Sequence, residues 1–409
     1  MKILHINCAD YGSTGKIITD ISRLAFLQQH KSYLCVPYVM TTDEEFINKI
    51  SVCKKHETGV YRRIAKILGL RYGFAPFSTK RILRVIKEVK PDIVHIHSAN
   101  CNMVNLYRLF DFLKKRSIAT VITNHAEFFY TGTCSHAEEC TQWETGCQNC
   151  PDIRNRAQSL FVDRTSTAWK KMKKAFSNFS RIHIVSVSPW VYERSKRSPI
   201  TGKLPQRIIL NGIDTNVFCI KEKSTIKEKL GIEQNEKMLL YVTAMFAPDK
   251  ESDIKGSREL IDLALKLSDK KVKIVVVGQC ANLNTVIPDN VILVGHIYNQ
   301  EELADYYSAA DLSIITSKRE TFSMIVAESL CCGTPVVGFQ AGGPETIALQ
   351  GYSEFFASGD VDALYKGICN KWLSLKESYN PKILSEMAAK IYSGTVMSEK
   401  YLDLYKEMI

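Results

Sequence analysis

The sequence predicts an α/β protein built from two doubly wound, Rossmann-like domains. Short apolar runs alternate with amphipathic stretches along the chain, which is typical of parallel strands connected by helices. The chain has 409 residues, of which 45% are hydrophobic, and this is too long for one core of ordinary size. The segment Pro199–Pro205 predicts a boundary near residue 204. We therefore expect domains at 1–203 and 204–390, and a terminal helix at 391–409 that packs on the first domain.

The expected elements follow one another in the order that this fold requires. Strands of the first half are expected at 1–7, 91–97, 118–123 and 181–188. Helices are expected at about 17–29, 104–115 and 189–198. Strands of the second half are expected at 207–214, 238–243, 271–277, 291–295, 311–316 and 336–339. Its expected helices lie at 255–267, after Phe322, and at 381–409 with a break at Ser393. Ligands of such folds bind at the carboxyl ends of strands.

The first strand is followed by a glycine-containing turn, Gly12-Ser13-Thr14-Gly15, and then by Lys16. Backbone N–H groups at the start of a helix favour an anion such as phosphate. The turn matches neither the Walker sequence nor the full dinucleotide-binding sequence, so ATP hydrolysis and NAD chemistry are not indicated. A tight turn that needs glycine explains these residues equally well.

His125 lies in the segment that follows the strand expected at 118–123. A histidine at the carboxyl end of a parallel strand is well placed to act on a ligand, and we select it as a candidate catalytic residue. His95 and His97 lie within a strand, so we expect them to be core residues or to support other groups.

Four of the thirteen cysteines lie in one short segment: Cys134, Cys140, Cys147 and Cys150. In a reducing compartment, four such thiolates suit a structural Zn²⁺ in a tetrahedral site. Free thiols or a redox pair are the alternative. A catalytic metal is disfavoured because four ligands leave no open position.

The net charge of +11 indicates an acidic partner: nucleic acid, an anionic membrane surface or a phosphate-bearing substrate. Residues 54–90 interleave basic and apolar side chains, as a helix lying on an anionic bilayer does. An ordinary solvated helix face is the alternative. No nucleic-acid-binding module accompanies the charge, so we expect no nucleic acid partner.

The start of the chain, Met1–Asn7, is predicted to be a strand and lacks the features of a signal peptide. No run of about twenty apolar residues is found. We therefore expect a cytoplasmic protein that can attach peripherally to the inner face of the cell membrane.

Two carboxylates, Glu320 and Glu328, stand eight residues apart in a segment predicted to contain a short buried helix. On one helix they would lie two turns apart along the axis and roughly 80° apart around it, so both could face one ligand. A capping acid and a surface acid are the alternative. Lys255, at the start of another helix, can add a positive charge for a phosphate.

Several separated motifs together resemble glycosyltransferase family 4. Those of the second half are Asn211-Gly212-Ile213-Asp214 with Phe218, Lys255-Gly256, Glu320-x7-Glu328, Cys332-Gly333-Thr334-Pro335-Val336-Val337 and Gly342-Gly343-x-Glu345. The first half matches more weakly, through Gly12–Gly15, His125 and Thr131-Gly132. The Thr-Gly-x-Cys run with its later cysteines resembles the bacterial exopolysaccharide, capsule and O-antigen transferases. The family implies a GT-B fold, with two Rossmann-like domains facing a central cleft, and retaining transfer from a nucleotide sugar.

The resemblance implies roles for residues of the second half. Glu328 would hold the ribose hydroxyls of the nucleotide, and Glu320 would face the donor sugar. The backbone N–H groups of three successive residues would meet sugar hydroxyls or the diphosphate. These residues are Thr321, Phe322 and Ser323.

On the phosphate side, the resemblance implies that Lys255, Lys16 and the loop from Gly12 to Gly15 neutralise the leaving diphosphate. The family commonly has an arginine shortly before the lysine of the Lys-Gly pair. Lys250 is the candidate substitute here, although a lysine cannot reproduce the arginine's fork of donors.

His125, by the same resemblance, would contact the sugar near the reacting carbon and stabilise the developing oxocarbenium centre. The new bond would form on the face that the nucleotide leaves. The residue after this histidine is often aspartate, whereas here Ala126 follows and Glu127 comes next. The sequence leaves open whether Glu127 takes that place.

No Asp-x-Asp pair stands among these motifs, and a divalent ion on a diphosphate usually needs clustered carboxylates. We therefore expect metal-ion-independent catalysis, with structural zinc as the one candidate cofactor. The expected partners are a nucleotide-sugar donor and a lipid-linked or oligosaccharide acceptor. Two other functions stay open: a nucleotide-sugar epimerase of the same fold, and a catalytically silent nucleotide-sugar-binding subunit of a polysaccharide assembly.

Overall fold

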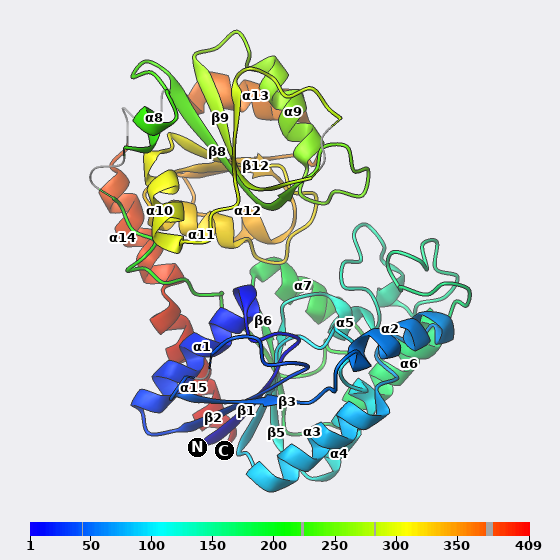
Figure 1. Cartoon of the computed structure of the whole chain (residues 1–409). Coiled ribbons are helices and arrows are strands. Elements are labelled where there is room, and N and C mark those ends of the chain that lie inside the picture. Colours follow the sequence, from blue (N-terminus) through cyan, green and yellow to red (C-terminus); the bar gives the residue numbers. More distant parts are fainter. Residues whose placement is uncertain (43, 222–224, 282–283, 374–378) are drawn as a thin grey trace. The chain divides into compact units, whose positions relative to one another are not determined.

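The computed structural model describes residues 1–42, 44–221, 225–281, 284–373 and 379–409. The chain divides into two compact units, one of Met1–Asn211 with Met397–Ile409 and one of Gly212–Val396. Each unit contains one parallel sheet whose strands alternate with helices (Figure 1). The predicted fold class, two doubly wound α/β domains, is thus confirmed.

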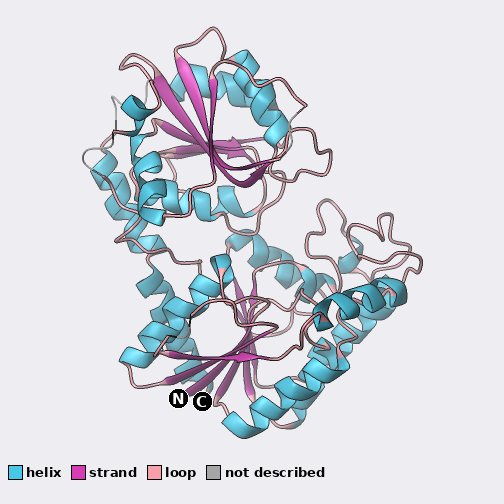
Figure 2. Cartoon of the chain, in the orientation of Figure 1, coloured by secondary structure: helices cyan, strands magenta, loops and turns pink. Residues whose placement is uncertain are grey.

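The first sheet has seven parallel strands in the order β3-β2-β1-β4-β5-β6-β7. These are β1 (Lys2–Ile6), β2 (Lys31–Val36), β3 (Ile47–Ser51), β4 (Ile93–Ile96), β5 (Ala119–Asn124), β6 (Ile182–Ser186) and β7 (Gln206–Ile208). Every residue of β4 and β5 is buried, because helices cover both faces of the sheet (Figure 2). Double coverage explains why these strands are buried along their whole length, with His95 and Thr123 as polar members.

The helices of the first unit connect these strands. They are α1 (Gly12–Leu27), α2 (Glu57–Leu68), α3 (Pro76–Val89), α4 (Leu106–Lys115), α5 (Phe128–Thr131), α6 (Thr165–Phe176) and α7 (Pro189–Arg197), with a 3-10 turn at Gln142–Glu144. The strand predicted near residue 207 was expected to open the second domain. It is instead β7, an edge strand of the first sheet. Its pairing with β6 decides its place, and the first unit therefore extends to Asn211.

The second sheet has six parallel strands in the order β10-β9-β8-β11-β12-β13. These are β8 (Lys237–Phe246), β9 (Val272–Cys280), β10 (Val291–Gly295), β11 (Leu312–Ile315), β12 (Val336–Phe339) and β13 (Ser353–Phe356). The helices are α8 (Ile226–Lys229), α9 (Ser257–Lys266), α10 (Gln300–Ala309), α11 (Met324–Cys331), α12 (Gly343–Ile347) and α13 (Val361–Gly367), with a π-helical turn at Ile368–Trp372. Leu260 and Leu263 of α9 and Trp372 pack with strand residues in one buried core.

Two further helices complete the chain, α14 (Pro381–Tyr392) and α15 (Gly394–Met408). They are separated at Ser393, where the Gly394 N–H donates a 2.8 Å hydrogen bond to the Ile213 carbonyl. Gly212 makes this contact feasible, because a Cβ there would lie 2.5 Å from the Gly394 Cα. Beyond this point, Tyr401 and Tyr405 of α15 are buried in the core of the first unit.

Both sheets reverse their strand order at one place. In the first sheet the reversal lies between β1 and β4, and in the second it lies between β8 and β11. Loops that leave neighbouring strands in opposite directions open a crevice at such a point, where α/β proteins bind ligands. In the second unit, the loops after β8 and β11 contain Lys250, Lys255, Glu320 and the turn 321–323.

Candidate active site

The second unit brings two charged side chains together beyond its switch-point strands. Lys255 lies in the loop between β8 and α9, and Glu320 lies in the loop between β11 and α11. The Lys255 Nζ is 2.8 Å from the Glu320 Oε1. The Ser317 hydroxyl donates a 2.7 Å hydrogen bond to the same oxygen. Charge-assisted bonds of this length are strong. The ion pair therefore joins the two loops, and the Ser317 bond fixes Glu320 within its own loop.

Glu320 is 8% exposed, and its surroundings decide its charge. Burial alone would raise the pKa of this carboxyl. The nearby Lys255 ammonium and the hydrogen bonds from Lys255 and Ser317 outweigh burial and hold that pKa below its ordinary value. Glu320 is therefore an acceptor-only carboxylate at neutral pH. Because an ammonium carries three donors, Lys255 can hold Glu320 and bind another anionic oxygen.

The backbone of the Lys-Gly pair is fixed by close contact with the end of β11. Gly256 has φ +75°, and a Cβ there would lie 2.0 Å from the Thr316 carbonyl oxygen. The Thr316 hydroxyl donates a 2.7 Å hydrogen bond to the Gly256 carbonyl, and the Tyr241 hydroxyl donates one of 2.9 Å to the Lys255 carbonyl. Only glycine fits this position, and it sets the point from which the Lys255 side chain extends.

A second glycine pair fixes the loop that carries Glu320. The Glu320 N–H donates to the Ala341 carbonyl at 2.9 Å, and the Gly343 N–H donates to the Glu320 carbonyl at 2.8 Å. A Cβ on Gly343 would lie 2.4 Å from the backbone of Thr321. Glu345 accepts a 2.8 Å hydrogen bond from the Gly342 N–H. The Gly-Gly-x-Glu motif therefore positions the backbone of Glu320.

Glu320 and Glu328 do not share a helix, so that prediction is wrong. Helix α11 begins at Met324, and the preceding Ser323 has φ +88°, which is not helical. Glu328 lies within the helix, is half-buried, and accepts a 2.9 Å hydrogen bond from the Tyr307 hydroxyl. The two carboxylates therefore have different partners, an ammonium for Glu320 and a phenol for Glu328.

The turn between Glu320 and α11 consists of Thr321, Phe322 and Ser323. Phe322 is buried and Thr321 is half-buried. Lys250, selected as a substitute for the missing arginine, is exposed in the turn that follows β8. Its neighbour Asp249 accepts a 2.7 Å hydrogen bond from the Asn284 N–H.

The chain contains one Asp-x-Asp sequence, Asp360-Val361-Asp362, and both carboxylates are engaged at the start of α13. Asp360 caps this helix by accepting a 2.9 Å hydrogen bond from the Ala363 N–H. Asp362 forms an ion pair of 2.6 Å with Lys266. The pair therefore serves the helix and its ion pair with α9.

In the first unit, the glycine-containing segment belongs to a helix. Helix α1 begins at Gly12 instead of near residue 17, so Gly12, Gly15 and Lys16 lie in its first turns. A Cβ on Gly15 would lie 2.7 Å from the Asp10 carbonyl carbon. Close approach of two backbone segments thus explains Gly15, which lies inside the helix and not in the tight turn that the sequence suggested. Lys16 is half-buried.

His125 directly follows β5 and is half-buried. Its Nε2 lies 3.2 Å from the Nδ1 of His97, and the Nε2 of His97 lies 3.1 Å from the Nδ1 of His5. Burial lowers the pKa of His5 and of His125 to about 3, and it lowers the pKa of His95 and of His97 well below the ordinary value. All four rings are therefore neutral at neutral pH.

Glu127 is turned away from the place that an aspartate after the histidine would take. Its carboxylate lies 3.2 Å from the Arg194 guanidinium and accepts a 2.6 Å hydrogen bond from the Ala137 N–H. It is fully buried. Glu127 therefore anchors the cysteine-containing loop to α7.

The four selected cysteines lie near one another and are free thiols. Burial and the neighbouring thiols raise the pKa of Cys147 to about 12 and raise the pKa of Cys134 further. Two tryptophans hold the loop: Trp143 donates to the Cys140 carbonyl at 2.8 Å, and Trp169 donates to the Trp143 carbonyl at 2.9 Å. Among the described residues, the group with three possible metal-ligating atoms within 4.8 Å of one another is made of histidines, not cysteines.

His97 was expected to be a core residue or to support another group; it is buried and contacts His125. The sequence did not predict that His125 is its partner or that His5 takes part. Tyr307, the partner of Glu328, was also missed. The available signal was the spacing of two between His95 and His97, which places both on one face of the sheet.

Two family models match the chain. Residues 29–217 match the model described as Glycosyltransferase Family 4, and residues 222–388 match the one described as Glycosyl transferases group 1. The chain is 21% identical over 341 residues to WcaC of Escherichia coli (strain K12), which is named as a colanic acid biosynthesis glycosyl transferase. The aligned residues cover 79% of this chain and 78% of WcaC. It is 31% identical over 174 residues to the D-inositol 3-phosphate glycosyltransferase of Streptosporangium roseum, which covers 39% and 40% of the two chains.

Solved structures agree on the fold. The sucrose-phosphate synthase of Thermosynechococcus elongatus superposes with a TM-score of 0.72 at 14% identity and covers 100% of this chain and 99% of that one. A glycosyltransferase from Rickettsia africae gives a TM-score of 0.67 at 16% identity, with 100% and 98% covered. The solved structures show a GT-B fold, and the family models show that the chain is a glycosyltransferase. With both family models matched, the chain belongs to glycosyltransferase family 4.

No helix in the described ranges is both long enough and apolar enough to cross a bilayer.

Proposed function

We propose that the protein is a retaining glycosyltransferase that moves a sugar from a nucleotide-sugar donor to a lipid-linked glycan acceptor during synthesis of a bacterial surface polysaccharide, such as O-antigen, capsule or exopolysaccharide. The observation that carries the proposal is the Lys255–Glu320 pair beyond the switch-point strands of the second unit. It combines a cation for a diphosphate with a fixed carboxylate for hydroxyl groups. The colanic acid name of WcaC supports the polysaccharide.

The donor is assigned to the second unit by the chemistry of its side chains. A leaving diphosphate needs positive charge, which Lys255 supplies as a point charge with spare donors. Sugar hydroxyls need acceptors, which the Glu320 carboxylate supplies, and Glu328 offers the same to ribose. The neighbouring turn, Thr321–Ser323, would meet the sugar or the diphosphate. HepE of Anabaena, whose structure is described as a complex with UDP-glucose, supports a nucleotide sugar, with a TM-score of 0.66 at 14% identity.

The reaction is proposed to need no metal ion. Lys255 would stabilise the leaving group, with Lys16, Lys250 and the Gly12–Gly15 segment as further contributors. His125 would contact the sugar near its reacting carbon and stabilise the oxocarbenium centre. The clustered carboxylates of Asp360-Val361-Asp362 are already used by α13 and by the ion pair with Lys266.

Transfer assays with a panel of nucleotide sugars test this function. Glu320→Gln and Lys255→Ala should each lower kcat by about 100-fold or more, because each removes a charged group at the reacting end. Lys318→Ala is the matched control. Lys318 stands two residues before Glu320 and forms an ion pair of the same length, 2.8 Å, with Glu259. Full activity of both site variants would overturn the site assignment.

Product analysis separates the proposed function from its alternatives. Retention predicts that the anomeric configuration of the donor persists in the product, as NMR would show. Metal-independent catalysis predicts that removal of Mg²⁺ and Mn²⁺ leaves the rate unchanged. Conversion of the donor without an acceptor would indicate an epimerase. Donor binding without turnover over all acceptors would indicate a silent binding subunit.

We also propose that the first unit contacts an anionic membrane at the cytoplasmic face. Val60 and Ile67 of α2 are 50% and 54% exposed, and Phe161 is 76% exposed. The two segments adjoin, because the Leu160 N–H donates a 3.0 Å hydrogen bond to the Lys66 carbonyl. Neighbouring exposed apolar side chains, unlike scattered ones, indicate an interaction site.

Charge identifies the surface that this apolar patch would meet. Arg62 and Arg63, on the same helix, are exposed, and basic side chains beside apolar ones favour anionic lipid headgroups. Phe161→Asp, and Arg62→Glu with Arg63→Glu, should each weaken binding to phosphatidylglycerol vesicles about tenfold. Tyr298→Asp, at a residue 89% exposed in the second unit, is the control. Unchanged binding of both variants would contradict the proposal.

A structural zinc ion in the cysteine loop is proposed from its donor set. Four thiols, Cys134, Cys140, Cys147 and Cys150, lie in one loop, and a bound Zn²⁺ would offset the burial that disfavours their thiolates. Elemental analysis should find about one zinc per chain. Four freely titrating thiols and no zinc would contradict it.

A further inference from the structure

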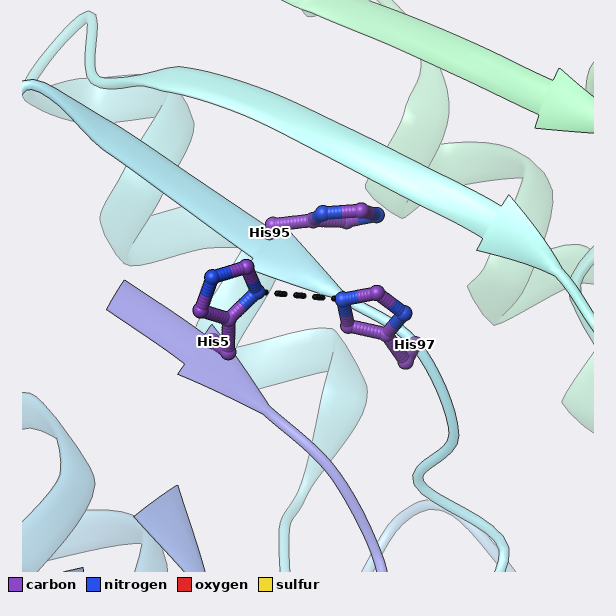
Figure 3. Close-up of side chains that lie close together, drawn as sticks. All are labelled: His5, His95 and His97. Atoms are coloured by element: carbon purple, nitrogen blue, oxygen red, sulfur yellow. Dashed lines mark hydrogen bonds between the residues drawn. The ribbon is translucent and has the colours of Figure 1, made fainter. Parts of the chain in front are cut away.

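Four histidines of the first unit meet at the carboxyl ends of three neighbouring strands. His5 of β1 and His95 of β4 are partners in the parallel register, and His97 lies two residues after His95, on the same face of the sheet. His5, His95 and His97 are fully buried, and Figure 3 shows the rings of His5 and His97 joined by a hydrogen bond. His125 follows β5, the next strand.

Both ring nitrogens of His95 contact hydroxyl groups and not another histidine. Its Nδ1 lies 2.5 Å from the Tyr405 hydroxyl, and its Nε2 lies 2.8 Å from the Thr123 hydroxyl. Its ring stacks on that of His97, with centroids 3.7 Å apart. His95 therefore connects α15 to the sheet and limits the movement of His97, but its nitrogens do not bond to another histidine.

His97, in contrast, bonds to histidines through both nitrogens, to His5 through Nε2 and to His125 through Nδ1. A neutral imidazole has one donor and one acceptor. His97 must therefore donate to one neighbour and accept from the other, which gives the row His5–His97–His125 a single direction. Two directions are conceivable, and they place the proton of His125 on different nitrogens.

The far end of the row decides between the two directions. The Nε2 of His5 is buried and has no hydrogen-bond partner in the described structure. If the row ran from His125 to His5, this nitrogen would carry a buried N–H without an acceptor, which folded proteins rarely tolerate. If it runs from His5 to His125, only a lone pair is left without a donor.

We propose that His5 and His97 are positioning residues that hold His125 in one neutral tautomer, with Nε2 accepting from His97 and the proton on Nδ1. This inference rests on the proposed contact between His125 and the sugar. An oxygen of the sugar that approaches His125 at Nδ1 would then meet a hydrogen-bond donor. His125 would stabilise an oxygen there and would not remove a proton from it.

The buried rings of His5, His95 and His97 could in principle hold a metal ion, since their nitrogens lie within 4.8 Å of one another. The hydrogen bonds argue against this use, because both nitrogens of His95 are engaged by hydroxyl groups. Both nitrogens of His97 are likewise engaged by other rings. Elemental analysis decides the question, since one metal ion per chain lost on His5→Phe would overturn the proposal.

Two variants test the row. His97→Phe removes both bonds, and His5→Phe removes only the far one while keeping a ring in place. We expect kcat to fall by about 10- to 100-fold in His97→Phe and less in His5→Phe, with the donor KM changed by less than about twofold, because orientation is lost and binding is not. His183→Phe, at a histidine of β6 outside the row, should leave both constants unchanged.

A spectroscopic measurement keeps the test independent of activity. In protein labelled with ¹⁵N-histidine, the imidazole correlations of His125, assigned by their loss in His125→Ala, should show the Nδ1–H tautomer. In His97→Phe they should show a mixture. An unchanged tautomer in His97→Phe, or the Nε2–H form in the native protein, would overturn the proposal. Full activity of His125→Ala would instead refute the proposed role of His125 and leave the tautomer measurement valid.

Discussion

Mild acid should destabilise the first unit strongly, because it buries four neutral histidines. His5, His95, His97 and His125 have pKa values far below those of exposed histidines, so only the unfolded chain takes up their protons near pH 6. For such groups stability is full above the unfolded pKa of about 6.5 and is lost as pH falls below it. Carboxylates stay ionised in both states down to about pH 5, so this window reports on the histidines.

The magnitude follows from proton linkage. Between about pH 7 and pH 5.5, one histidine that stays neutral in the fold lowers the free energy of unfolding by about 1.2 kcal/mol. Four such rings and His183, whose pKa burial lowers to about 4, together give about 6 kcal/mol, a large part of the roughly 5–15 kcal/mol of an ordinary domain. With a urea m-value of about 2.5 kcal/mol/M, the midpoint should fall by about 2 M.

Tryptophan fluorescence can follow the first unit by itself. Trp143, Trp169 and Trp190 lie in it, and Trp372 lies in the second unit, so Trp372→Phe leaves fluorescence from the first unit only. His5→Leu should reduce the dependence of stability on pH by about one proton, whatever its effect on stability at pH 7. A midpoint that does not change between the two pH values would refute the reasoning.

Three other predictions concern binding and stability. Glu328→Gln should raise the donor KM by about 10- to 100-fold through loss of a charged acceptor, with a smaller effect on kcat; steady-state kinetics giving a KM within about twofold of the native value would contradict the ribose assignment. Gly256→Ala should lower the free energy of unfolding by about 2–4 kcal/mol. Gly231 has a similar φ of +66° but open space around it, so Gly231→Ala should lower the free energy of unfolding by only about 1–2 kcal/mol. Equal losses in thermal melts would show that crowding is unimportant. Tyr405→Phe should cost about 1–2 kcal/mol in urea unfolding, because it leaves the Nδ1 of His95 without its partner, and an unchanged midpoint would show that this bond adds nothing.

Local patterns were enough to predict many elements of the fold, although the strands β2, β3 and β13 were not expected. Apolar runs bounded by glycine and proline predicted strands such as β12, and Gly333, shortly before this strand, has the left-handed conformation that glycine favours, with φ +77°. Such features depend on residues near one another in the chain. The place of β7 in the first sheet was not predictable in this way, because a three-residue strand is assigned by its partner and not by its own sequence.

The candidate site was predicted in its residues more than in its geometry. Glu320 was placed on a helix because the spacing to Glu328 allowed it, whereas its loop is held out of the helix by pairing with Ala341 and Gly343, about twenty residues later. The contact between His97 and His125 depends on the register of β4 and β5, which no local pattern specifies.

The glycine motifs are better guides to this site than its charged residues are. Gly256 and Gly343 each lie where two backbone segments distant in sequence come too close for a Cβ, at 2.0 Å from the end of β11 and at 2.4 Å from the turn after Glu320. A glutamate or lysine can occupy many surface positions at little cost, so its presence says little about where it lies. A glycine with no room for a side chain admits almost no substitute, and Gly256 has a positive φ as well. These two glycines therefore fix the backbone on both sides of the Lys255–Glu320 pair, and the pair owes its 2.8 Å separation to them.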